Sequence, residues 1–421
     1  MDRRTMLRAT VVGAGAVALP FTAWSAAYGA PAQNATGPYG PLQPADARGI
    51  QLPAGFTSTI VARSRQTVSG TSYVWHDAPD GGAVIPNGTG WVYVSNSEVS
   101  SAAGGGASRI LFNSAGAVVG ASRILSGTNQ NCAGGKTPWD TWLSCEEVSR
   151  GRVFETYPLG GAAVARPALG RFKHEAAAAD PVRRVVYLTE DETDGRFYRF
   201  VPSAWGDLSA GTLQVFRAGS ATSGSFTWAN VPDPDGSPTA TRYQVSGARS
   251  FNGGEGCHYA DDTVWFTTKG DNRVWRVNLA TGSYALAYDD NLVSPGSAPL
   301  SGVDNITGTT AGDLYVAEDG GTMDICLITP DDKVSPFLRI TGQSGSEITG
   351  PAFTPAGDRL YFSSQRGTSG SSSGGITYCV TGPFRRERSG PTAEQIGGRP
   401  GAAVRSCTTA GWSGSGRPAP R

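Results

Sequence analysis

A short run of apolar and aromatic residues that ends in polar or acidic residues recurs six times along the chain. The runs are 92–98, 141–147, 186–191, 264–269, 314–319 and 360–365. Their length and their content of β-branched and aromatic residues predict β-strands. Between the aromatic residues at positions 93, 142, 187, 265, 315 and 361, the spacings are 49, 45, 78, 50 and 46 residues. This period indicates a repeated structural unit.

A second apolar run follows most of these strands. The second runs are 108–112, 195–200, 272–277, 324–328 and 375–380. Repeats of this length with paired short strands predict an all-β chain that forms one six-bladed β-propeller over about residues 50–385. The run 56–61 would supply the outer strand of the last blade and close the ring, which leaves no exposed sheet edge. A β-sandwich is the alternative, although it gives no reason for a long sequence period.

Two segments depart from the repeat. The 78-residue spacing contains a stretch rich in Gly, Ser, Pro and Asp at about 202–250, which we expect to be an insertion outside the regular blade pattern. The chain also changes composition at its end, where residues 386–421 have few apolar side chains. We expect this C-terminal tail to be an appendage of the propeller.

Residues 1–32 have the pattern of an export signal. Adjacent arginines at positions 3 and 4 precede an uncharged apolar run over 9–19, which indicates the twin-arginine route, although Met6 stands where that motif prefers phenylalanine. The run is shorter than the roughly 20 apolar residues of a membrane-spanning helix. We therefore expect an exported protein, extracellular or periplasmic, with the twin-arginine translocase as a transient partner and no stable membrane span.

Composition narrows the possible functions. The net charge is zero and only 17% of residues are charged, which disfavours a nucleic-acid binder held by excess positive charge. The three histidines and the absence of a C-x-x-C motif disfavour zinc, so a metal centre would depend on carboxylates and favour calcium or trivalent iron. The six cysteines allow three disulfides in 15 connectivities. We expect a monomer without a nucleic-acid partner.

The polar ends of the six repeats hold the candidate functional residues. Three places after each aromatic residue stand Asn96, Cys145, Glu190, Thr268, Glu318 and Ser364, and four places after it stand Ser97, Glu146, Asp191, Lys269, Asp319 and Gln365. If the aromatic strand is the innermost strand of its blade, these ends meet at one mouth of the channel. Crowded carboxylates repel one another and protonate unless cations lie between them. The pattern therefore favours several bound metal ions, with solvated strand ends as the alternative.

Several motifs in this chain resemble PhoX-type alkaline phosphatases. They are the segments 93–98, 134–147, 170–176, 187–191, 194–200, 254–256 and 304–306. The resemblance covers most of the chain from about residue 50 to about residue 385. It implies a six-bladed propeller, exported by the twin-arginine route, that hydrolyses phosphomonoesters at a cluster of Fe³⁺ and Ca²⁺ ions. A small phosphorylated substrate is then the expected ligand.

The resemblance also suggests roles for individual residues. Cys145 matches the iron-bridging thiolate of the family, and a disulfide between Cys145 and Cys132 is the alternative. His174 is expected to position its neighbour rather than to bind metal. The remaining matched metal ligands are Glu175 and Glu255 for iron, and Glu146, Glu98, Glu190 and Asp191 for iron or calcium.

The chain departs from the family at one position of the site. The resemblance places a phosphate-binding arginine two residues before Glu255, where this chain has Gly253. A guanidinium group that would match phosphate with two hydrogen bonds is thereby lost. Lys269 and Arg366 are the candidate replacement cations, and together with Glu255 they are the candidate catalytic residues. The alternative is a non-catalytic, metal-stabilised propeller that binds a protein or a glycan.

Overall fold

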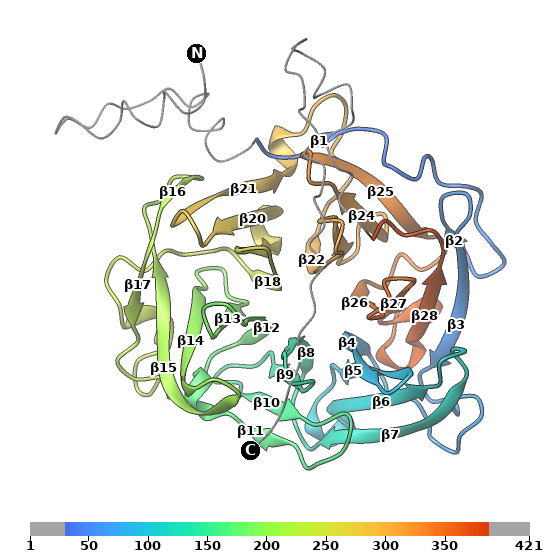
Figure 1. Cartoon of the computed structure of the whole chain (residues 1–421), viewed down its shortest axis with the longest axis horizontal. Helices are drawn as coiled ribbons and strands as arrows, with labels where there is room; N and C mark the ends of the chain where they lie inside the picture. The colour runs from blue at the N-terminus through green and yellow to red at the C-terminus, as the bar shows by residue number, and fades with distance from the viewer. Residues whose placement is uncertain (1–29, 387–421) are drawn as a thin grey trace, which may run out of the picture.

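The computed structural model describes residues 30–386, which form six sheets around a central channel, antiparallel except for one short parallel pairing at the edge of one sheet (Figure 1). The predicted six-bladed β-propeller is confirmed. The predicted export signal lies outside the described residues except for its last three, and so does the tail except for Arg386. Within the described range no helix is long and apolar enough to cross a membrane.

The blades follow one another in chain order, and their strands are given from the channel outward. Blade 1 contains β4 (Pro79–Asn87), β5 (Gly90–Ser97), β6 (Gly106–Phe112) and β7 (Val118–Ser126). Blade 2 contains β8 (Asn131–Lys136), β9 (Trp142–Glu146), β10 (Val153–Thr156) and β11 (Val164–Ala165). Blade 3 contains β12 (His174–Asp180), β13 (Val185–Glu190), β14 (Phe197–Ala204), β15 (Asp207–Arg217) and β17 (Thr227–Asn230).

The second half of the ring has the same plan. Blade 4 contains β18 (Gly254–Ala260), β19 (Thr263–Thr268), β20 (Arg273–Asn278), β21 (Ser283–Asp289) and β16 (Gly224–Ser225). Blade 5 contains β22 (Val303–Gly308), β23 (Leu314–Glu318), β24 (Asp324–Ile328) and β25 (Lys333–Ile340), with β1 (Gln33–Asn34) and β2 (Ile50–Gln51) pairing to β25. Blade 6 contains β26 (Ile348–Phe353), β27 (Arg359–Ser364), β28 (Ile376–Thr381) and β3 (Thr57–Arg63).

Short 3₁₀ helices lie in the connections. They are η1 (Ser101–Ala103), η2 (Pro167–Leu169), η3 (Thr241–Tyr243), η4 (Lys269–Asp271), η5 (Asp290–Leu292), η6 (Gly367–Ser369) and η7 (Ser372–Gly374).

The strand beside the channel is not the aromatic strand that the repeat pattern identified, which corrects that part of the prediction. In every blade a strand rich in small residues precedes the aromatic strand and lies innermost (Figure 1). An added Cβ on Gly81 would lie 2.5 Å from Cα of Ala133, and one on Gly256 would lie 2.6 Å from N of Ile306. Six strands thus converge where little space is left for side chains, so these strands lack the hydrophobic alternation that marks the others.

The aromatic residues of the repeat pack between neighbouring blades. Tyr93 of blade 1 stacks on Tyr361 of blade 6 with ring centroids 4.9 Å apart, and Tyr315 of blade 5 packs edge-on against Phe353 of blade 6 at 5.0 Å. Each ring buries a large apolar surface and makes the offset or edge-on contacts that aromatic pairs prefer. The sequence period therefore reflects packing between blades rather than the lining of the channel.

The ring closes as predicted, whereas the long spacing has a different cause. β3, from the start of the described chain, pairs antiparallel with β28 and completes blade 6. The stretch predicted as an insertion at 202–250 begins inside blade 3, because β15 is the fourth strand of that blade and β17 adds a fifth. β16 pairs with β21 of blade 4. Much of the 78-residue spacing therefore belongs to the sheets.

Candidate metal centre

Every blade carries a β-bulge near the same mouth of the channel. There, the pairing between the innermost strand and the second strand shifts by one residue. In five blades the residue after the last regular pair is an acid or a thiol, and we call these five the bulge residues. They are Asp80, Cys132, Glu175, Glu255 and Asp304. A bulge re-aims a side chain at one point of a strand, and here it gathers ligands from different blades.

A second set of polar side chains comes from the residue directly after each second strand. We call these the strand-end residues. They are Glu98, Glu147, Asp191, Lys269, Asp319 and Gln365. Blade 6 has no acidic bulge residue, and Glu347, directly before β26, contributes a carboxylate instead.

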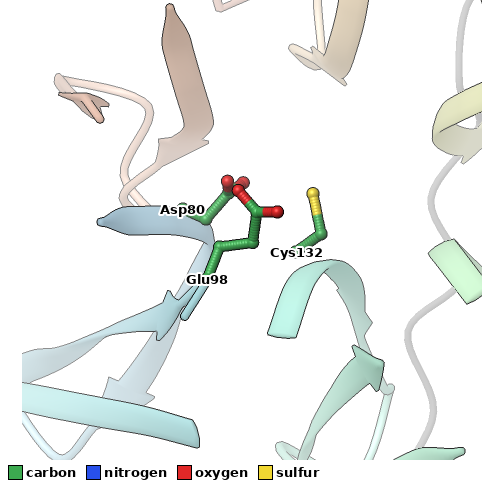
Figure 2. Close-up of side chains that lie close together, drawn as sticks. All are labelled: Asp80, Glu98 and Cys132. Carbon is green, nitrogen blue, oxygen red and sulfur yellow. The ribbon is translucent and has the colours of Figure 1, made fainter. Parts of the chain in front are cut away.

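These residues form four overlapping ligand groups. The groups are Asp80–Glu98–Cys132, Cys132–Glu147–Glu175, Glu175–Glu255–Asp304 and Asp304–Asp319–Glu347. Within each group, one ligand atom from each residue lies within 4.8 Å of the others. Figure 2 shows the first group, whose members come from β4, from the end of β5 and from β8. Because successive groups share a member, the ligands form one continuous arc.

Two basic side chains at this mouth hold carboxylates of the arc. Lys173 Nζ lies 2.9 Å from Glu147 and 2.6 Å from Asp191. Arg366 Nη1 lies 2.6 Å from Oε1 of Glu347. In contrast, Asp80 and Glu98 share a neutral partner, because the side-chain amide of Gln365 donates to both at 2.6 Å.

Lys269 is the third basic side chain of the mouth. Its Nζ lies 3.0 Å from Glu255, 3.2 Å from Asp319 and 3.7 Å from Asp304. Burial lowers the pKa of Lys269, but the charges of these carboxylates outweigh burial and hold the pKa above its usual value. Among the described residues, the arc together with Asp191 has nine carboxyl groups against three basic side chains, an excess of six carboxyl groups.

Burial and mutual repulsion raise the pKa of the carboxyl groups. Burial, followed by the charge of Glu147, raises the pKa of Glu98 to about 7. Burial also raises the pKa of Asp304 to about 6, although Lys269 opposes the shift. The pKa of Glu175 is well above its ordinary range, again first through burial. Such groups bind protons near neutral pH unless cations replace the protons.

The residues present fit a cluster of iron and calcium ions. Oε2 of Glu175 is buried and has no hydrogen-bond partner among the described residues, and Oε1 accepts a hydrogen bond from the thiol of Cys132 at 3.1 Å. A buried carboxylate oxygen without a partner is unfavourable, and a metal ion would satisfy it. Carboxylate oxygens suit calcium and trivalent iron, and a thiolate adds a softer ligand for iron.

Cys145 does not take the role that the resemblance suggested. It packs with Leu143 and Val153 in an apolar cluster, and it belongs to none of the four groups. The cysteine at the channel is Cys132. The disulfide alternative is also wrong, because both cysteines are free, as are the other cysteines in the described range.

Glu146 and Glu190 are likewise corrected. Glu146 accepts hydrogen bonds from the backbone N–H groups of Asn129 and Arg152, and Glu190 accepts one from the hydroxyl of Tyr198. Neither belongs to a ligand group. Both are the last residues of their strands, so their side chains point away from the residue that follows, because side chains alternate along a strand.

For Glu146, the error arose from aligning the repeats on their aromatic residues. Tyr93 and Trp142 stand four residues before the ends of β5 and β9, whereas the aromatic residues of the other four repeats stand three residues before the strand end. A slip of one residue moves a side chain to the opposite face of a strand. In blade 2 the alignment therefore selected Glu146 in place of Glu147.

The other predicted residues lie at the mouth. Glu98, Glu175 and Glu255 belong to the ligand groups, and the sequence reasoning missed Asp80, Cys132, Glu147, Asp304, Asp319 and Glu347 as ligands. Asp191, Lys269 and Arg366 lie beside the groups through their ion pairs. His174 donates from Nε2 to the carbonyl oxygen of Gly170 and is not in a group. One signal was available, since each bulge residue precedes a small residue, as in Asp80-Gly81, Cys132-Ala133, Glu175-Ala176, Glu255-Gly256 and Asp304-Asn305.

Gly253 lies directly beside this arc. Its φ of +69° is in the left-handed region, and an added Cβ would lie 3.2 Å from Oδ1 of Asp191. Its carbonyl oxygen accepts a hydrogen bond from the backbone N–H of Lys269 at 2.8 Å. An arginine at 253 would therefore be strained in this backbone.

Comparison with known proteins points to one family. The sequence model of the family described as alkaline phosphatase PhoX matches residues 90–162 and 151–283. Among solved structures, Pseudomonas fluorescens PhoX in complex with vanadate, a transition state analogue, has 17% identity and a TM-score of 0.65, over 81% of this chain and 97% of that chain. None of the curated protein sequences matches.

Other solved structures are more distant. A putative gluconolactonase has 13% identity and a TM-score of 0.47, over 83% of this chain and 100% of that chain. The calcium-binding protein regucalcin from Agrobacterium tumefaciens has 14% identity and a TM-score of 0.44, over 73% of this chain and 92% of that chain.

Proposed function

Because the chain belongs to the PhoX-type alkaline phosphatase family, we propose that it is a metal-dependent phosphatase that hydrolyses phosphomonoesters at the mouth of the propeller channel. The arc of four overlapping ligand groups carries this proposal. It gathers carboxyl groups and one thiol at one mouth of the channel, and metal ions would balance the excess of carboxyl groups over basic side chains among the described residues.

The residues of the arc would hold Fe³⁺ and Ca²⁺. Cys132 is shared by two groups and is therefore the candidate ligand between two metal ions, with Glu175 beside it. Bound ions would polarise the phosphoryl group and balance the charge that develops on it. Gln365 orients Asp80 and Glu98 by its two hydrogen bonds, which fixes the ligands before the ions bind.

Arg366 and Lys269 are the two candidate cations for the substrate phosphate. Their side chains are 31% and 35% exposed, so both reach the rim of the mouth where a substrate enters. Neither reproduces the arginine that the family places at position 253. Loss of one preorganised donor typically lowers the rate by about 10²–10³, so we expect turnover below that of a complete member of the family.

We further propose that residues 1–32 direct export by the twin-arginine translocase, to the periplasm or the extracellular space. The paired arginines at positions 3 and 4 and the apolar run that follows support this. That route carries folded proteins, so the metal ions would be bound before export. We expect the exported protein to act as a monomer.

The proposal is tested by metal analysis and turnover on one preparation. Protein purified from its native host should contain iron and calcium and should hydrolyse p-nitrophenyl phosphate at alkaline pH, and chelation should abolish the turnover. Protein without either metal and without turnover would contradict the proposal. Bound metal without turnover of any monoester or diester would favour the alternative, a metal-stabilised propeller that binds a protein or a glycan.

A further inference from the structure

Lys269 brings a positive charge into the part of the arc where Asp304 is shared by two ligand groups. Its Nζ is within 3.7 Å of Glu255, Asp304 and Asp319, which are members of those groups. The backbone holds the residue in place, because the N–H of Lys269 donates to the carbonyl oxygen of Gly253 at the start of η4. The ammonium group thus lies among oxygens that could otherwise bind a metal ion.

The other half of the arc has a different charge balance. Among the described residues, no basic side chain forms an ion pair with Asp80, Glu98 or Glu175. Within residues 30–386, the only ion pair to a carboxylate in the two groups around Cys132 is that of Lys173 with Glu147. In the two groups around Cys132, basic side chains therefore balance little of the carboxylate charge. The two groups that share Asp304, in contrast, contain the ammonium group of Lys269.

Building on the proposed metal-dependent function, we propose that Lys269 is a built-in cation of the centre, which occupies one cation position between Glu255, Asp304 and Asp319. Calcium binds carboxylate oxygens at about 2.3–2.6 Å, so an ion on these oxygens would have to lie within a few ångströms of the ammonium group and would be repelled by it. This chain therefore binds one metal ion fewer than its four ligand groups would accept, and the ions concentrate around Cys132.

This arrangement also gives Lys269 and Arg366, the two basic residues at the rim, different roles. Lys269 is committed to three carboxylates, whereas the guanidinium of Arg366 pairs with Glu347 through Nη1 and has its Nη2 3.8 Å from Asp319. Arg366 is then the side chain left to hold the phosphate.

The test is a calcium titration of the metal-free full chain, followed calorimetrically and by elemental analysis. Lys269→Met removes the charge and keeps the length of the side chain, so this variant should bind about one more Ca²⁺ per chain than the wild type. Lys269→Arg keeps the cation and should retain the wild-type number. Lys136→Met is the matched control, because Lys136 pairs with Asp140 away from the ligand groups, and it should also leave the number unchanged.

The outcome for Lys269 is separate from the outcome for the proposed function. An equal or smaller number of bound ions in Lys269→Met would overturn the inference, whatever the turnover of the wild type. If the variant does not fold without metal, the same count is made by elemental analysis of Lys269→Gln produced in calcium-containing medium. A wild type that binds no metal would refute the phosphatase proposal, while a gain of an ion in the variant would still uphold the role of Lys269.

Discussion

Metal ions should stabilise this protein more strongly as the pH rises from 5 to 8. In the metal-free protein, the pKa of Glu98 is about 7 and that of Asp304 is about 6, against ordinary values of 4.5 and 3.8. A raised folded-state pKa stabilises the fold below the unfolded pKa, and that contribution is lost as the pH rises through the folded pKa. Metal ions compete with protons for these carboxyl groups. At high pH the groups carry no protons, so metal binding no longer has to displace any.

The size of the effect follows from these two groups. A pH of 5 lies about two units below the pKa of Glu98 and about one unit below that of Asp304. At this pH, metal binding must therefore displace a proton from each carboxyl group. At about 1.4 kcal/mol per unit, this makes the stabilisation by metal about 4 kcal/mol larger at pH 8 than at pH 5. The unfolding entropy of about 360 residues is roughly 0.75 kcal/mol/K, so the gain in Tm should grow by about 5 °C.

The assay compares the Tm of chelated and iron- and calcium-loaded protein at pH 5, 6, 7 and 8, at constant ionic strength. Burial lowers the pKa of both His174 and His258 to about 4, and their opposite contribution to the pH dependence cancels because it is present in both samples. A gain in Tm that stays constant, or that shrinks from pH 5 to pH 8, would refute the assignment of these carboxylates to the metal centre.

Four substitutions test other parts of the account. Glu147→Gln should lower the bound metal measured by elemental analysis, whereas Glu146→Gln should leave it unchanged and lower the free energy of unfolding in urea by about 1–2 kcal/mol, because it loses charged acceptors of backbone N–H groups; equal metal content in both would contradict this. Gly81→Ala should destabilise the fold by about 2 kcal/mol or more, since its Cβ would lie 2.5 Å from Cα of Ala133, and an unchanged Tm would argue against a closely packed channel. Arg366→Met should raise KM for p-nitrophenyl phosphate about tenfold with unchanged metal content, and an unchanged KM would exclude Arg366 from phosphate binding.

The number of blades could be predicted from sequence because packing between blades leaves a strong signal. Tyr93 and Tyr361 are fully buried and stack on each other, so large rings recur at the same place in each repeat. The closing strand could be predicted for a similar reason, since the run at 56–61 is a strand without a partner in the first repeat. The innermost strands could not, because crowding at the axis selects small residues such as Gly81 and removes the alternation that marks a strand.

The site was predicted in part for a related reason. Asp191 and Lys269 follow their strands directly, and counting from the aromatic residue places them correctly. Cys132 and Asp80 owe their positions to β-bulges, and a bulge adds one residue that no regular period contains. The thiol was assigned to Cys145 from the resemblance, and no regular period could point to Cys132 instead, whereas Cys145 occupies a regular strand position in the apolar cluster between blades.

The most direct test of the central claim compares the two cysteines in one assay. The rate of p-nitrophenyl phosphate hydrolysis is measured for iron- and calcium-loaded Cys132→Ala and Cys145→Ala, with the Tm of each as a check on folding. Cys132→Ala should lose about 10²-fold or more in rate together with bound iron, because it removes a ligand shared by two groups. Cys145→Ala should keep most of the rate. A loss of activity in Cys145→Ala alone, or equal rates in the two variants, would contradict a metal centre built around Cys132.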